Sequence, residues 1–165
     1  RPRRANETNG VDYHFVSEAD FVAMIDADAF LEHARVFDHR YGTARESVLT
    51  HLAAGEDVIL EIDWQGAAQV RRILPESRSI FILPPSRAEL RSRLEGRGQD
   101  SPEVIAHRLD EAVSELSHYA DADFLVVNDD FATAVADLQA IIRATRLGAS
   151  RQHPALKSLL TELLS

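Results

Sequence analysis

The residues Val58-Ile59-Leu60-Glu61-Ile62-Asp63-Trp64-Gln65-Gly66 decide the fold class of this chain. Their first five positions form a near-continuous apolar run, which is typical of a strand covered on both faces of a sheet. The sequence predicts a helix directly after it, over residues 66–74, which Pro75 stops. The stretch is therefore interpreted as one strand-and-helix unit of an α/β protein.

The same alternation continues toward the C-terminus. Residues 79–83 and 124–127 are two further apolar runs, which we expect to form buried strands. The capping and periodicity signals predict helices over residues 86–97, 101–119, 133–147 and 154–164. Strands alternating with helices predict a parallel sheet with helices on both faces, and ligands bind such sheets at the carboxyl ends of the strands.

The N-terminal part is expected to form a smaller lobe. Ser17 followed by Asp20 resembles a capping box and predicts a short helix over residues 17–25. A strand is predicted over residues 30–37, then a turn at residues 41–43. A helix should follow over residues 44–54 and end at Gly55.

Composition excludes several classes of function. The chain has 165 residues, of which 45% are hydrophobic, enough for one good core. It has no cysteine, so disulfides, Cys-ligated zinc and thiol nucleophiles are excluded. No apolar run approaches the roughly 20 residues of a membrane span, and the expected location is the cytoplasm. A net charge of −9 argues against non-specific binding to nucleic acid or to an anionic membrane.

Two carboxylates lie where the central predicted strand ends. Asp63 occupies its carboxyl end, and Glu61 points to the same side of the strand two residues earlier. Such a pair can hold a metal ion, accept a proton or bind donor groups of a ligand. Both residues can equally cap the next helix or pair with arginines, and position alone leaves these interpretations even.

Glu32 interrupts an otherwise apolar strand face formed by Phe30, Ala34 and Val36. A buried carboxylate needs partners, because burying it unpaired costs roughly several kcal/mol. Adjacent N–H donors, such as N1–H and N2–H2 of a guanine edge, match a bidentate carboxylate. The residues alone favour the alternative, which is a structural ion pair with an arginine.

Arginines gather in three groups despite the acidic composition. Fork-shaped guanidinium groups suit phosphate oxygens, although acidic neighbours also allow a solvated helix face. The groups comprise Arg1, Arg3 and Arg4; Arg93 and Arg97, which are i,i+4 neighbours; and Arg108. No phosphate loop of the form G-x-x-x-x-G-K-[ST] occurs in the sequence. The leucines of the C-terminal helix indicate core packing or a homo-oligomer contact.

Taken together, these segments resemble guanylate kinase of the bacterial type, over nearly the whole chain. Arg1-x-x-Arg4 and Gly10-Val11-Asp12-Tyr13-His14-Phe15 resemble the family stretch T-T-R-x-x-R…G-x-D-Y-x-F. The other matching segments, in order, are Phe30-Leu31-Glu32-His33-Ala34, Tyr41-Gly42-Thr43, Glu61-Ile62-Asp63-Trp64-Gln65-Gly66, Ile82-Leu83-Pro84-Pro85-Ser86, Arg93-Leu94-Glu95-Gly96-Arg97-Gly98 and Val126-Val127-Asn128-Asp129-Asp130. This many motifs at family spacing make the resemblance specific.

The resemblance implies a role for each matching residue. Arg1, Arg4, Tyr13 and Tyr41 would hold the phosphate of GMP, and Glu32, Thr43 and Asp63 would bind its guanine base. Arg93, Arg97 and Arg108 would clamp the ATP phosphates and the group in flight, with Asp63 beside them in the catalytic set. Asn128 would lie near the adenine, and Glu61 would contact Mg²⁺ through water.

The resemblance also implies the fold and the reaction. The fold would be that of a P-loop nucleoside monophosphate kinase, with a GMP-binding lobe over 1–45, core over 46–98 and 121–165, and a helical lid over 99–120. The reaction would be in-line transfer of the γ-phosphoryl group of ATP to GMP or dGMP, giving ADP and GDP, with Mg²⁺ on the donor phosphates. The alternatives are a ribose-bisphosphate-type sugar-phosphate kinase and a non-catalytic guanylate-kinase-like module that binds phosphoproteins.

The sequence departs from the family pattern in two respects. Glu61 stands where the family more often has Asp, which leaves its contact with metal-bound water open. The family's first strand and phosphate loop precede the residue that corresponds to Arg1. The resemblance therefore implies either that these 165 residues are part of a longer enzyme or that they are an inactive fragment, with some of the core exposed.

Overall fold

The computed structural model describes residues 1–4, 6–36, 39–96 and 102–165. They form two compact units, Arg1–Ser77 and Arg78–Ser165, each of which is described by itself. Both units combine helices with strands, so the α/β class is confirmed. Over the described ranges, no helix has both the length and the apolar character needed to span a membrane.

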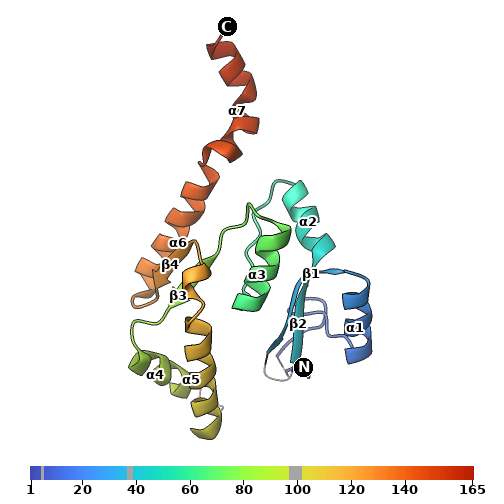
Figure 1. The fold of residues 1–165 in the computed structure, drawn as a ribbon, viewed down its shortest axis with the longest axis vertical. Coiled ribbons are helices and arrows are strands. Elements are labelled where there is room, and N and C mark those ends of the chain that lie inside the picture. The colour runs from blue at the N-terminus through green and yellow to red at the C-terminus, as the bar shows by residue number, and fades with distance from the viewer. Residues whose placement is uncertain (5, 37–38, 97–101) are drawn as a thin grey trace. The chain divides into compact units, whose positions relative to one another are not determined.

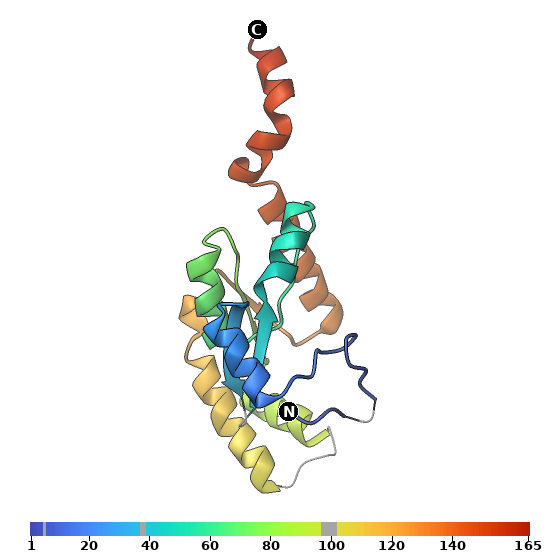
Figure 2. The same cartoon turned by 90° about the vertical axis from the view of Figure 1, so that its right-hand side faces the viewer.

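The first unit is a β-hairpin packed with helices (Figure 1). Its elements are α1 (Glu18–Asp26), β1 (Phe30–Val36), β2 (His39–Ala44), α2 (Arg45–Ala53) and α3 (Trp64–Ile73). The hydroxyl of Ser17 accepts the backbone N–H of Asp20, which confirms the predicted cap of α1. Phe21 of α1 stacks on Phe30 of β1, with ring centroids 4.5 Å apart, and Figure 2 shows α1 beside the hairpin.

The turn predicted at residues 41–43 is wrong, because these residues lie inside β2. The strands are antiparallel, with Gly42 opposite His33 and Thr43 opposite Glu32. A Cβ atom on Gly42 would lie 2.8 Å from a ring carbon of Phe30. Gly42 therefore forms no turn. Its missing side chain leaves room for the ring of Phe30 to approach the strand backbone closely, which is another use of glycine in strands.

The core of this unit is small and apolar. It consists of Leu31, Val48 and Val70, contributed by β1, α2 and α3. The strand predicted over residues 58–62 is wrong. Val58, Leu60 and Ile62 pack against the core, while Ile59 between them is 75% exposed. The segment is thus covered on one face, and over the described residues it joins no sheet.

The second unit contains a parallel pair of strands, which confirms the predicted parallel pairing. The strands are β3 (Ile80–Leu83) and β4 (Phe124–Val127), aligned with Ile80 opposite Phe124. The helices are α4 (Arg87–Gly96), α5 (Pro102–Leu116), the short η1 (Tyr119–Asp121), α6 (Phe131–Arg146) and α7 (Ala149–Leu163). Asp130 caps α6, and bonds from the backbone and hydroxyl of Thr133 lower the pKa of its carboxyl group.

Two expectations for this unit are wrong in detail. Residues 79–83 and 124–127 do contain strands, but Ile82, Leu125 and Val127 are about half exposed instead of covered on both faces. Within the described part of the unit, β3 and β4 pair only with each other, so the outer edge of each strand has no neighbouring strand. The last helix begins at Ala149, and Pro154, its predicted start, lies inside it.

The contrast between Leu31 and Ile59 gives a stability prediction. Leu31 is 1% exposed, so Leu31→Ala should leave a cavity and lower the free energy of unfolding by about 2–5 kcal/mol. Ile59→Ala should change it by less than about 1 kcal/mol, because its side chain is already in water. Denaturant unfolding of both variants checks this. Equal losses would contradict the one-sided packing of residues 58–62.

Candidate functional site

Glu32 is the buried carboxylate of the first unit. It is 4% exposed, and its Oε1 accepts the hydroxyl of Thr43 at 2.6 Å. The pairing of β1 with β2 places Thr43 directly opposite Glu32. The ladder shifts register between Phe30 and Glu32, a bulge that leaves Leu31 in the apolar core beside this carboxylate. A bulge of this kind redirects a side chain, and here it permits an acid next to a hydrophobic core.

The first turn of α3 forms the other wall of this site. A Cβ atom on Gly66 would lie only 2.7 Å from Oε2 of Glu32, so the carboxylate lies directly against the helix. Asp63 is the N-cap of α3, and its Oδ1 accepts the backbone N–H of Gly66 at 2.8 Å. The side chain of Gln65 donates to Oδ2 at 3.3 Å. Glu32, Thr43 and Asp63 therefore gather around the start of α3.

The two alternatives left open by the sequence can now be compared with the structure. Among the described residues no arginine forms an ion pair with Glu32, whose partner is the hydroxyl of Thr43. Asp63 does cap its helix, and only part of its acceptor capacity is used in doing so. The arrangement leaves two neighbouring carboxylates with lone pairs for a donor-rich ligand.

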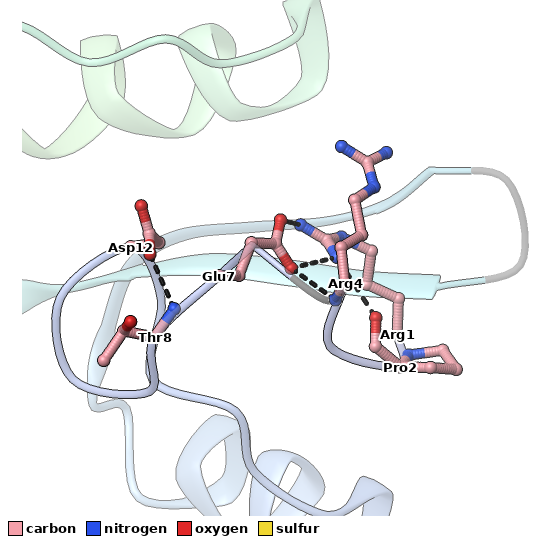
Figure 3. Close-up of polar contacts among 6 residues, drawn as sticks. All are labelled: Arg1, Pro2, Arg4, Glu7, Thr8 and Asp12. Carbon is pink, nitrogen blue, oxygen red and sulfur yellow. Dashed lines mark hydrogen bonds and ion pairs between the residues drawn. The ribbon is translucent and has the colours of Figure 1, made fainter. Parts of the chain in front are cut away.

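Arg1 lies among aromatic rings and binds an acid. Its guanidinium carbon is 5.0 Å from the ring centroid of Tyr13 and 5.7 Å from that of Phe15. Both terminal nitrogens donate to the carboxylate of Glu7, Nη1 at 2.8 Å and Nη2 in a shorter contact (Figure 3). This pairing raises the pKa of Arg1 and lowers the pKa of Glu7 to about 2.

The other predicted phosphate ligands lie close to Arg1 along the chain or in space. The backbone N–H of Arg4 donates to Glu7 at 2.8 Å, and Figure 3 shows its guanidinium pointing away from that carboxylate. The rings of Tyr13 and Tyr41 meet edge to face, with centroids 6.4 Å apart. Cationic and hydroxyl donors thus gather at one place, which is a suitable setting for a phosphate.

In the second unit, α4 and the end of β4 meet through Arg93. Its Nη1 donates to the backbone carbonyl of Asn128 at 2.9 Å, and its Nε donates to Glu89 at 2.7 Å. Arg108 lies on α5 and is half-buried. Arg97 lies outside the described residues. The structure therefore unites Arg93 with Asn128 at the carboxyl end of a parallel strand, where ligands of such sheets bind.

The described residues contain no cluster of three or more His, Asp or Glu side chains able to hold a metal ion. Glu61 is exposed next to Asp63, whose oxygens already accept bonds from α3. A single exposed carboxylate fits Mg²⁺, which retains most of its waters and takes phosphate oxygens as ligands. It would not hold the ion alone.

The sequence interpretation missed Glu7 and assigned no role to Gly66. Glu7 follows the two arginines within a few residues, and an acid at that spacing can accept both a guanidinium and a backbone N–H. Gly66 belongs to a quoted motif, but the need for a missing Cβ there depends on Glu32, which is far away in sequence. Of the two residues, only Glu7 could have been found from its neighbours in the sequence.

Comparison with known proteins gives consistent results. The family profile described as guanylate kinase matches residues 1–145. The guanylate kinases of Yersinia pestis bv. Antiqua (strain Antiqua) and Escherichia coli (strain K12) are each 56% identical over 165 residues, which is 100% of this chain and 80% of theirs. The crystal structure of guanylate kinase from Anaplasma phagocytophilum superposes with a TM-score of 0.80 at 33% identity, covering 96% of this chain and 79% of that one.

The pairing of Arg1 with Glu7 predicts an unusual titration. The folded pKa of Glu7 is lowered to about 2, so the pairing stabilises this segment above the ordinary glutamate range and is lost as pH falls toward 2. The side-chain carboxyl signal of Glu7, followed by NMR, should titrate near pH 2. In Arg1→Ala the midpoint should return toward the ordinary glutamate value of about 4.3. An unchanged midpoint in that variant would show that the guanidinium is not the cause.

Proposed function

The chain belongs to the guanylate kinase family, and we propose that Glu32, Thr43 and Asp63 bind the guanine base of its acceptor, GMP. Membership makes it a nucleoside monophosphate kinase with the fold of that family. Its reaction transfers a phosphoryl group from ATP to GMP, giving ADP and GDP. The assignment of individual residues to this reaction is our proposal.

The buried carboxylate of Glu32 is the observation that carries the base-binding role. One of its oxygens accepts Thr43, and the other lies against Gly66 at the start of α3. Guanine offers N1–H and N2–H2 as adjacent donors, which two neighbouring carboxylates can accept together. Adenine presents an acceptor, N1, at the corresponding edge, so an acid there would repel it. The pair therefore supports selection of GMP over AMP.

The phosphate of GMP is assigned to Arg1, Arg4, Tyr13 and Tyr41. Arg1 has five N–H donors, and Glu7 uses only some of them, so others remain for phosphate oxygens. Glu7 also holds the backbone of Arg4, which fixes the spacing of the two arginines. These contacts support the assignment of residues 1–45 as the acceptor lobe.

On the donor side, the proposal assigns the ATP phosphates to Arg93, Arg97 and Arg108, and the adenine to Asn128. Arg93 is already oriented by Glu89 and the carbonyl of Asn128, which limits its side-chain freedom before ATP binds. Phosphoryl transfer of this kind depends on positioning and charge stabilisation, without covalent catalysis by the protein. Residues 99–120 are proposed as the lid that excludes water, with residues 46–98 and 121–165 as the core.

Three further elements belong to the proposal. Mg²⁺, when bound, would neutralise charge on the donor phosphates, and Glu61 would contact it through water.

The exposed leucines of α7, among them Leu159 and Leu163, are proposed to form a homo-oligomer contact, which sedimentation velocity would test. The proposed compartment is the cytoplasm, where nucleoside monophosphates meet the ATP pool.

Calorimetric titration tests the assigned function. GMP should bind, and AMP should not bind measurably under the same conditions. A folded chain that binds both nucleotides equally, or neither, would overturn the assignment of the base to this site. Circular dichroism run on the same sample confirms that the chain is folded.

A substitution in the carboxylate pair sharpens this test. Glu32→Gln retains an oxygen for Thr43 but turns one acceptor into a donor facing the guanine edge. The Kd for GMP should rise at least about 30-fold, which corresponds to about 2 kcal/mol. The matched control is Glu46→Gln on α2, which removes an exposed carboxylate of the same unit and should leave the Kd unchanged. Equal Kd values for the two variants would contradict the proposed role.

A further inference from the structure

Gln69 connects α3 to β1 through both ends of its side-chain amide. Its Oε1 accepts the backbone N–H of His33 at 3.1 Å, and its Nε2 donates to the backbone carbonyl of the same residue at 2.8 Å. The Nε2 also donates to the carbonyl of Gln65, one turn earlier in α3, at 3.2 Å. This two-point bond reproduces the pairing that a neighbouring strand would make with His33.

The bond lies next to the site in both elements. His33 directly follows Glu32 on β1, and Gln69 lies three residues after Gly66, on the same face of α3. Two bonds to the backbone of one residue, His33, fix the position of α3 along β1 more strictly than apolar packing does, because packing is not directional. The amide therefore ties α3, which begins at its N-cap Asp63, to the strand that carries Glu32.

Glu32 has little free space, so the position of the start of α3 relative to its carboxylate is important. The start of α3 is so close that one added carbon on Gly66 would lie 2.7 Å from Oε2 of Glu32 and 3.2 Å from its Cδ. A Cβ there would also lie 3.2 Å from the Cβ of Ile62. A shift of α3 along β1 would therefore either press on the carboxylate or open a gap beside it. Either change would misalign the two acids.

We propose that Gln69 is a positioning residue for guanine recognition: its amide holds α3 on β1 so that Glu32 and Asp63 face both donors of the base together. The inference depends on the proposed binding of guanine by these acids. Both ends of the Gln69 amide are already bonded to backbone groups, so in this inference it acts through the two acids and makes no contact of its own with the nucleotide. Loss of the amide should therefore change the selectivity for the base more than it changes the phosphate contacts. Those contacts are assigned to side chains outside α3, namely Arg1, Arg4, Tyr13 and Tyr41.

The experiment compares GMP with IMP, which retains N1–H but lacks the 2-amino group. The ratio of their Kd values reports whether the second acid reaches the second donor. Gln69→Met retains the length and helix propensity of the side chain without the amide, and Gln69→Ala removes it entirely. Both variants should weaken GMP binding about 10-fold and reduce the GMP-to-IMP preference several-fold, with IMP binding changed less.

Gln152→Ala is the matched control. Gln152 also donates its amide to a backbone carbonyl, that of Arg146, at 2.8 Å, but it lies in the second unit. The control should retain the wild-type preference for GMP. If the Gln69 variants fold and keep that preference, or lose GMP and IMP affinity equally, Gln69 serves stability alone and the inference is overturned. If wild-type protein shows no preference for GMP over IMP, the proposed guanine site fails and the inference fails with it.

Discussion

A carboxylate buried beside a hydrophobic core constrains the first unit of this protein. Glu32 is almost fully removed from water, and its charge has to be compensated by donors because an unpaired buried acid is strongly destabilising. The structure provides the hydroxyl of Thr43. The rest of its environment follows: a bulge that separates it from Leu31, a glycine that leaves it space, and a helix start that brings a second acid. In the proposed complex, the N–H donors of guanine would complete the compensation.

The same physical logic separates the two kinds of recognition. In the proposed site, acids bind the base and arginines bind the phosphates, and each set has neighbours that support it. Glu7 pairs with Arg1 and holds the backbone of Arg4, while Glu89 orients Arg93. Acceptor contacts are assigned mainly to the first unit, and donor contacts mainly to the second. A protein of net charge −9 can therefore bind phosphate groups through a few oriented guanidinium groups.

Local signals in the sequence predicted most of the helices, because caps and periodicity depend on residues close in the chain. Ser17, Ser86 and Asp63 all cap helices in the structure. Burial was predicted less well. Ile59 and Ile82 belong to apolar runs, but whether a run is covered on both faces depends on neighbouring elements, which local sequence does not show. Gly42 was misread because a glycine that admits an aromatic ring looks like a glycine in a turn. The family resemblance supplied the expected roles of the site residues. Glu7 carried a local signal that the sequence interpretation missed, whereas the contacts of Gln69 with His33, 36 residues away in the chain, emerged only from the fold.

The structure of this chain with GMP bound, by crystallography or NMR, would show directly whether the two acids bind the base. We expect the guanine N1 and N2 atoms to lie about 2.7–3.1 Å from carboxylate oxygens of Glu32 and Asp63, with Thr43 still bonded to Glu32. A base bound away from α3, or a Glu32 carboxylate that contacts Thr43 alone while GMP is present, would contradict it.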